Sequence, residues 1–273
     1  MGEPCWMIRG EDGVVLMVES DASSHVESEL QAYAEENQLP SGLPLEEQPG
    51  GWWAPAVYAW ALLLAYLRQT QAPREWIDRG SVSYHRLVEQ HEWWRPWTAL
   101  TLHGDLAHLA SNIFFGLLFA LPLQRMIGSG WMLWTFVITG SIGNVINTWL
   151  KAGESAGSIG ASTAVFGFLG ALVSVRITSW VLEHQRWRWR EILLPLGAGA
   201  ALLAMLGAQP ADMFGQPIDN TAHFWGFTVG LGLGPVILAT PLIRWRQGWR
   251  STLLAWLAPV PFFLAWWWAG QGG

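Results

Sequence analysis

Long apolar runs separated by short polar segments dominate the chain from residue 52 onward. The runs are Trp52–Leu67, Leu106–Met126, Trp131–Leu150, Gly160–Thr178, Ile192–Leu206, Ala222–Ile243 and Ser251–Trp268. A helix needs roughly 20 apolar residues to cross a bilayer, with a usual range of about 17 to 25. The first and fifth runs are short, and the other five reach this length. The pattern predicts an all-α polytopic membrane protein with six spans and an additional C-terminal span.

The first fifty residues have a different pattern. The stretches CWMIRG and GVVLMVE, joined by the turn GEDG, predict two short strands, and a helix is expected from about Ser24 to Asn37. The Pro- and Gly-rich segment LPSGLPLEEQPGG then predicts a linker. We therefore expect a small α+β domain with its linker at residues 1–50, a six-span core at 51–250 and an extra transmembrane helix at 251–273.

The distribution of charge predicts the orientation. Residues 1–50 hold eleven Asp and Glu against Arg9 alone, whereas residues 51–273 hold fourteen Lys and Arg against ten Asp and Glu. Arg-rich loops around residues 125, 176–190 and 244–250 alternate with loops that hold only Lys151. By the positive-inside rule, the Arg-rich loops and the N-terminal domain are cytoplasmic. The first loop, from Arg68 to about Arg95, has five Arg and several Trp, which favours an amphipathic segment in the outer interface.

Composition also excludes several classes of function. The single cysteine, Cys5, can form neither an intramolecular disulfide nor a Cys-based metal cluster. The chain has no GxxxxGK[ST] loop for ATP, and its acidic soluble domain would repel nucleic acid. Few intramembrane carboxylates and no visible inverted repeat argue against a transporter. We expect no cofactor and no nucleic-acid partner.

Two residues with complementary chemistry lie within the predicted spans. Ser162 follows the glycine-rich GSIGA at the start of the fourth run, and His223 lies near the start of the sixth. Polar residues at membrane depth are costly and therefore indicate function, and a serine beside a histidine is the pairing of a nucleophile with its base. The alternatives are an N-cap or packing role for Ser162 and a packed, hydrogen-bonded histidine for His223.

Small residues favour close contact between these two spans. A stripe at four-residue spacing follows the sixth run: Ala222, Gly226, Gly230 and Gly234. Gly167 belongs to a similar pattern in the fourth run, and such stripes allow helix backbones to approach closely. Gly160 lets the chain turn sharply into the fourth span. The imidazole of His223 would then lie within hydrogen-bond range of the Ser162 hydroxyl.

A third cluster precedes the second run in WRPWTALTLHGDLAHLASN. His108 and Asn112 are one helical turn apart and both can donate hydrogen bonds, as stabilisation of an oxyanion requires. His103 and His108 could instead be metal ligands, but no carboxylate or thiolate in the membrane joins them, so we expect no metal.

Together these motifs make the chain resemble the rhomboid intramembrane serine proteases. The resemblance covers about residues 52–243 and rests on Trp94–Arg95, HGDLAHLASN, GASTAVFG and AHFWGFTVG, which occur in this order, each in its own span or loop. The strand and helix near the N-terminus also resemble part of the cytosolic domain of many bacterial members. The resemblance implies a rhomboid-like six-helix bundle in a bacterial inner membrane, with the N-terminus in the cytoplasm.

The resemblance also implies the chemistry. Ser162 and His223 would form a catalytic dyad, with His108, Asn112 and the backbone N–H of Ser162 stabilising the oxyanion. The substrates would be transmembrane proteins, cleaved in or near their spans. Thr163 stands where the family usually has glycine. A membrane chaperone without catalytic activity, and a protease that trims and sorts anchored surface proteins, are the alternatives.

Overall fold

The computed structural model describes residues 5–10, 13–18, 21–37, 52–152, 157–183, 188–207 and 219–271. Contacts divide the chain into two compact units, Met1–Leu43 and Pro44–Gly273. The division falls within the linker region expected from the sequence. A separate boundary at residue 250 remains a prediction.

The N-terminal unit contains a hairpin and a helix. Strand β1 (Cys5–Gly10) pairs antiparallel with β2 (Gly13–Val18), so that Cys5 lies opposite Val18 and Gly10 opposite Gly13. Helix α1 follows at Ser23–Asn37. Its described elements thus occur in the order that the sequence predicts.

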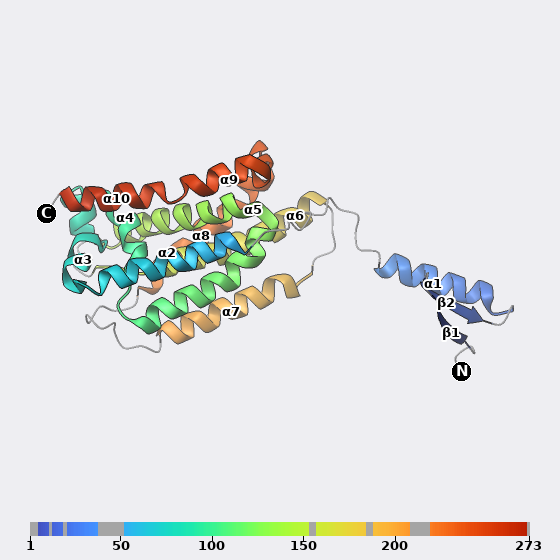
Figure 1. The fold of residues 1–273 in the computed structure, drawn as a ribbon. Helices are drawn as coiled ribbons and strands as arrows, with labels where there is room; N and C mark the ends of the chain where they lie inside the picture. The colour runs from blue at the N-terminus through green and yellow to red at the C-terminus, as the bar shows by residue number, and fades with distance from the viewer. Residues whose placement is uncertain are drawn as a thin grey trace. The chain divides into compact units, whose positions relative to one another are not determined.

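The second unit, called here the membrane unit, is built mainly from helices (Figure 1). Its elements are α2 (Trp53–Gln69), α3 (Pro73–Gly80), η1 (His85–Glu89), α4 (Arg95–Thr98), η2 (Ala99–Thr101), α5 (Leu106–Leu150), α6 (Ser162–Glu183), α7 (Arg190–Gly207), α8 (Asn220–Leu238), η3 (Pro241–Arg246), α9 (Gly248–Leu257) and α10 (Val260–Gln271).

Four helical segments among the described residues are long and apolar enough to cross a membrane. They are Leu106–Leu150, Ser162–Leu182, Asn220–Leu238 and Gly248–Gln271. Helices α2 and α7 are not among them, in line with the short first and fifth apolar runs. The chain is therefore a multi-pass membrane protein.

Helix α5 contains two of the predicted spans and reverses direction between them. The Tyr58 hydroxyl donates to the Asn112 carbonyl oxygen at 2.7 Å, while the Tyr58 ring lies 5.3 Å from that of Phe136. In a straight helix, Asn112 and Phe136 would be about 36 Å apart, at 1.5 Å per residue. The reversal occurs near Gly128, whose φ of 82° suits glycine, and Figure 1 shows the two halves of α5 folded back.

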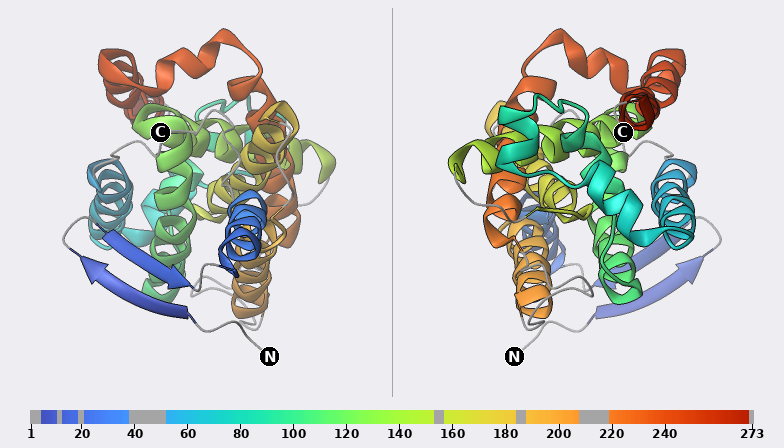
Figure 2. Two further views of the ribbon diagram at one scale, coloured as in Figure 1. Left: turned by 90° about the vertical axis from the view of Figure 1, so that its right-hand side faces the viewer. Right: turned by 90° about the vertical axis from the view of Figure 1, so that its left-hand side faces the viewer.

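Helix α6 lies at the centre of the membrane unit, with 72% of its apolar window buried. It packs most extensively against α8 and α5. The α8 contact is very close, because a Cβ at Gly226 would lie 1.9 Å from the Thr163 carbonyl oxygen and one at Gly230 would lie 2.3 Å from that of Gly167. Figure 2 shows α9 and α10, by contrast, at one edge of the membrane unit.

The first loop, which in the structure extends to the start of α5 at Leu106, is folded against the segment that leads into α6. The Arg95 side chain is only 2% exposed, forms an ion pair with Glu92, and donates to the carbonyl oxygens of Ser81 and Asp78 at 2.6 and 2.9 Å. The Gly160 N–H donates in turn to the Ala99 carbonyl oxygen at 2.9 Å. The first loop therefore supports the backbone two residues before Ser162.

Candidate active site

Ser162 and His223 are brought together at the starts of α6 and α8. Ser162 is the first residue of α6, and His223 lies in the first turn of α8. The Ser162 Oγ atom is 2.8 Å from the His223 Nε2 atom, within hydrogen-bond distance. The side chains are 5% and 3% exposed. A hydroxyl and an imidazole at this distance can exchange a proton while the hydroxyl acts as a nucleophile.

The orientation of His223 depends on packing. Its ring stacks on Phe166, with centroids 4.8 Å apart and planes 22° from parallel. Its second ring nitrogen, Nδ1, is buried and has no hydrogen-bond partner among the described residues. Among the described residues, Ser162 and His223 thus form a pair with no third hydrogen-bonding group, and Phe166 packs on the imidazole ring.

Gly160 allows the backbone just before Ser162 to lie close to the His108 ring. Its φ is 119°, which side chains other than glycine rarely adopt, and a Cβ would lie 2.7 Å from His108 Nε2 and 3.6 Å from Ser162 Oγ. Asp105 caps α5 by accepting from the backbone N–H of His108 at 2.7 Å. The cap fixes the helical turn that presents the His108 ring to this segment.

Asn112 lies one turn after His108 and is fully buried. Its side-chain Nδ2 donates to the His108 carbonyl oxygen at 3.0 Å, which uses one of its two N–H groups. The amide oxygen, Oδ1, is buried without a hydrogen-bond partner among the described residues. The structure therefore places Asn112 beside His108, and its role at the oxyanion remains a prediction.

His103 supports the backbone before the serine. It is fully buried, and its Nε2 accepts from the Ala161 N–H at 3.5 Å. Gln69 holds the His103 backbone on both sides, donating to its carbonyl oxygen at 2.7 Å and accepting from its N–H at 3.0 Å. Burial, followed by the neighbouring His108, lowers the pKa of His103 well below its usual range, so the ring is neutral. His103 therefore holds the backbone that leads to Ser162.

The described residues contain no group of three or more His, Cys, Asp or Glu side chains suited to hold a metal ion. His103 and His108 make a T-shaped ring contact with centroids 5.1 Å apart. A zinc site needs three or four ligands, which these two rings do not supply.

Thr163 occupies the seam between α5, α6 and α8. Its hydroxyl donates to Asn144 Oδ1 at 2.9 Å, and Asn144 Nδ2 donates to the Pro96 carbonyl oxygen of the first loop at 3.0 Å. The Thr163 methyl group has room because glycine faces it on both neighbouring helices, α5 and α8. A Cβ at Gly143 would lie 2.7 Å from this methyl group, and a Cβ at Gly226 would lie 3.1 Å from it. Thr163 is thus built into the helix packing beside Ser162.

Asp219, which the sequence analysis did not single out, anchors the helix that carries His223. It caps α8 by accepting from the Ala222 N–H at 3.2 Å, and its carboxylate contacts Lys151 Nζ at 2.8 Å and Asn147 Nδ2 at 2.6 Å at the end of α5. The signal that could have identified it is an N-cap aspartate one turn before a buried histidine.

The net electrostatic effect keeps Asp219 ionised. Burial raises the pKa of the carboxyl group, but hydrogen bonds from Lys151, Thr221 and Asn147, with the charge of Lys151, outweigh burial and lower the pKa below its ordinary value. The ion pair therefore joins the start of α8 to the end of α5 at neutral pH.

Comparison with known proteins gives one family for this arrangement. Residues 90–240, more than half of the chain, match the Rhomboid family, described as a Rhomboid domain. RHOMBOID-like protein 5 of Arabidopsis thaliana is 33% identical over 156 residues, which cover 57% of this chain and 48% of that protein.

Two other relatives are named as proteases. Rhomboid-type serine protease 2 of Emericella nidulans is 29% identical over 58% of this chain and 29% of its own length, and Rhomboid-like protease 3 of Toxoplasma gondii is 28% identical over 55% and 54%. The matches thus span about half or less of these relatives. The match over residues 90–240, which include Ser162 and His223, shows that the chain belongs to the rhomboid family.

Proposed function

We propose that this protein is an intramembrane serine protease that cleaves transmembrane proteins in or near their spans. The observation that carries the proposal is the 2.8 Å contact between Ser162 Oγ and His223 Nε2, buried at the starts of two membrane helices. The relatives named as proteases support the same reaction class.

The geometry supports a two-step reaction. Ser162 Oγ attacks the substrate carbonyl carbon while its proton passes to His223 Nε2. The imidazolium then gives this proton to the leaving amine as the C–N bond breaks, which leaves an acyl-enzyme on Ser162. Water then attacks the ester while His223 takes its proton, and the imidazolium gives that proton to Ser162 Oγ as the C–O bond breaks and the acid product leaves.

The oxyanion formed in each step needs donors. We propose that the backbone N–H of Ser162 and the side chains of His108 and Asn112 supply them. The first N–H groups of a helix have no partner within that helix, and Ser162 begins α6. The position of the His108 ring next to Gly160 supports its part in this group.

Because the Ser162 and His223 side chains are buried, a substrate must bring an accessible peptide bond to them. A transmembrane helix has its N–H and C=O groups bonded internally, so a peptide bond becomes available only where the helix unwinds. Substrates with helix-breaking or small residues near the cleaved bond are therefore expected to be favoured.

We also propose that the protein lies in a bacterial inner membrane and that its N-terminal unit is in the cytoplasm. The Arg-rich loops support the orientation through the positive-inside rule. The hairpin and helix support it through their resemblance to the cytosolic domain of bacterial rhomboids. The relatives named above are eukaryotic and do not bear on this assignment.

The test is cleavage of a single-span reporter by the purified protein in liposomes. We expect Ser162→Ala and His223→Ala each to lower kcat by about a thousandfold or more, as removal of a nucleophile or its base does in serine proteases. Ser179→Ala is the matched control, because this serine lies in the same helix and its hydroxyl donates to the Arg176 carbonyl oxygen within that helix. Equal activity in all four proteins would contradict the proposal, and so would inactivity of the wild type across several reporters.

A further inference from the structure

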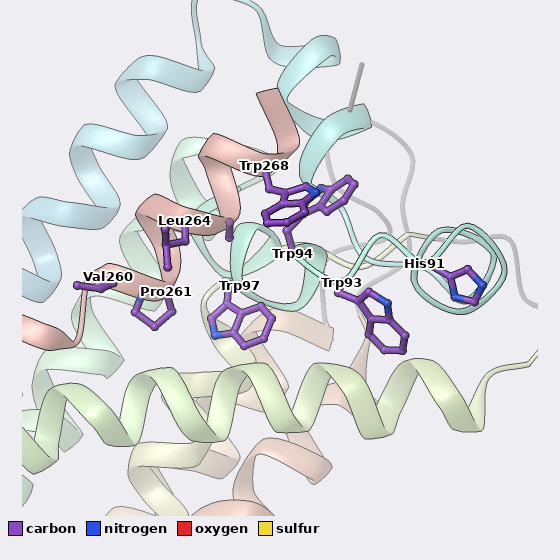
Figure 3. A pocket seen from close by; sticks show the side chains of 9 residues that line it. His91, Trp93, Trp94, Trp97, Val260, Pro261, Leu264 and Trp268 are labelled. Atoms are coloured by element: carbon purple, nitrogen blue, oxygen red, sulfur yellow. The ribbon is translucent and has the colours of Figure 1, made fainter. Parts of the chain in front are cut away.

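An apolar groove lies between the first loop and the C-terminal helix, on elements outside the catalytic pair (Figure 3). Its volume is about 490 Å³. The lining residues are His91, Trp93, Trp94, Trp97, Val260, Pro261, Leu264, Ala265 and Trp268. Figure 3 shows Val260 and Pro261 toward one end and His91 at the other, so the groove has an apolar end and a polar end.

The two walls of the groove are fixed to each other. Trp266 of α10 donates from Nε1 to Thr101 Oγ1 at 3.1 Å, and its ring lies 4.5 Å from that of Trp76. On the opposite wall, Trp94 Nε1 donates to the Arg79 carbonyl oxygen at 3.4 Å. These contacts hold α10 against the first loop, so the groove is a formed feature of the fold.

The outer face of the C-terminal helix is apolar and largely exposed. The segment Gly248–Gln271 is a candidate span, yet only 22% of its apolar window is buried within the protein. Beside the groove, Phe263 is 74% exposed and Trp267 59% exposed. In a membrane, such a face is covered by lipid, and the groove is continuous with it through Leu264 and Trp268, both of which are exposed.

The size of the groove favours a chain over a helix. An α-helix with its side chains is at least about 10 Å across, so a volume of 490 Å³ would hold only about one turn of it. An apolar cavity of about 150 Å³ already binds benzene, so this groove has room for a thin, flexible hydrocarbon several times longer. The aromatic walls offer broad apolar contact area and few polar groups.

The polar end has its own signature. His91 has a φ of 58°, the only positive value for a residue other than glycine in the described part of the chain. Its ring stacks beside Trp93, with centroids 6.3 Å apart. A strained residue persists only where the surrounding structure holds it, and such residues gather at ligand sites.

We propose that this groove binds one acyl chain of a membrane phospholipid. The chain lies along Trp97 and Leu264 with its methyl end toward Val260, and its ester end lies near His91. The groove thereby gives the C-terminal helix a lipid-binding role, in addition to its contact with the first loop.

The experiment uses the full-length protein in vesicles of phosphatidylethanolamine and phosphatidylglycerol, with a trace of phosphatidylethanolamine carrying a diazirine on one acyl chain. After illumination, labelled peptides are quantified by mass spectrometry. We expect labelling of residues 91–97 and 260–268 to exceed that of Phe114 and Leu118, exposed on α5, by about tenfold, as burial of two further methylene groups would give.

Two pairs of variants separate the groove from the general lipid face. Leu264→Trp, at the rim, should lower groove labelling by about tenfold, whereas Phe263→Trp, which does not line the groove, should leave it unchanged. Ala265→Leu enlarges a buried lining residue, and Ala269→Leu, one turn further along α10 and similarly buried but outside the lining, is its control.

Thermal unfolding of each variant checks that α10 remains packed. The inference is overturned if labelling simply follows exposure over all lipid-facing helices. It is also overturned if a single-span peptide displaces the lipid label from the groove, because the groove would then be a protein-docking surface. The readout is labelling, so it does not depend on proteolytic activity.

Discussion

Thr163 directly follows Ser162, and its hydroxyl donates a 2.9 Å hydrogen bond to Asn144 Oδ1. The Nδ2 atom of Asn144 donates in turn to the Pro96 carbonyl oxygen. Through this threonine, the start of α6 is tied to α5 and to the first loop. The three segments are held in one arrangement next to the proposed nucleophile.

Loss of the Thr163 hydroxyl should cost both stability and activity. Thr163→Val leaves Asn144 Oδ1 buried without its donor, which lowers the free energy of unfolding by about 1–3 kcal/mol. Thr163→Ser keeps the hydrogen bond and loses one methyl group, worth about 1 kcal/mol. We expect kcat of reporter cleavage to fall in the valine variant and to be retained by serine. Equal kcat for the two variants would show that the hydrogen bond has no part in positioning Ser162.

Gly226 and Gly232 give a matched pair for the contact between α6 and α8. A Cβ at Gly226 would lie 1.9 Å from the Thr163 carbonyl oxygen, whereas one at Gly232 would meet nothing within 4 Å. Gly226→Ala must push the helices apart, at a cost of about 1–3 kcal/mol or more for overpacking, and should abolish cleavage. Gly232→Ala should instead stabilise by up to about 1 kcal/mol through helix propensity. Thermal unfolding and reporter cleavage measure both effects, and similar behaviour of the two variants would contradict the close packing.

Gly160 should tolerate no side chain. Gly160→Ala combines a strained φ of 119° with a Cβ 2.7 Å from His108 Nε2, so the segment before Ser162 must move. We expect kcat to fall by about a hundredfold, the loss typical when one oxyanion donor is removed. Gly157→Ala is the control in the same segment, because the nearest neighbours of its Cβ would be the Ser81 hydroxyl at 3.2 Å and the Ser81 Cβ at 3.4 Å, at the end of a short side chain. An active Gly160→Ala protein would mean that His108 is not constrained by this backbone.

The ion pair of Asp219 and Lys151 predicts an acid limit of stability. The pKa of Asp219 is lower in the folded protein, so its contribution is fully present above the unfolded pKa of about 3.9 and is lost as the pH falls through the lower folded value. Asp219→Asn should remove this contribution and flatten the dependence below about pH 4. Lys151→Met should raise the folded pKa toward the unfolded value, so that the contribution becomes smaller and its loss is complete at a higher pH.

Thermal unfolding between pH 7 and pH 3 measures these shifts. Glu75→Gln is the control, since Glu75 pairs with Arg79 at the surface, where both side chains are about half exposed and such pairs contribute about 0–1 kcal/mol. Identical pH profiles for wild type and Asp219→Asn would rule out this anchor of α8.

Much of the architecture follows from the order of residues alone. Apolar runs of sufficient length predict helices in a membrane wherever they occur, because the transfer of each segment into lipid depends mainly on its own composition. The small-residue stripe of α8 likewise indicates a close helix contact. Ser162 and His223 stand out as polar residues of complementary chemistry within apolar runs, and the structure places Ser162 Oγ and His223 Nε2 2.8 Å apart.

Other features depend on which helices meet and in what register. Thr163 and Asn144 come from different helices, as do Asp219 and Lys151, and no local pattern says which donor will face which acceptor. The stacking of Phe166 on His223 and the packing of Trp266 against the first loop are decided in the same way.

The sequence by itself thus determined the membrane class, the approximate spans and the two residues that we propose for acyl transfer, because these depend on composition and short-range spacing. Only the tertiary structure decided how Thr163 and Asp219 fix the two helices, and how α10 forms a groove with the first loop. Those outcomes require side chains far apart in the chain to reach one place, and contact geometry, rather than hydrophobic pattern, sets their partners.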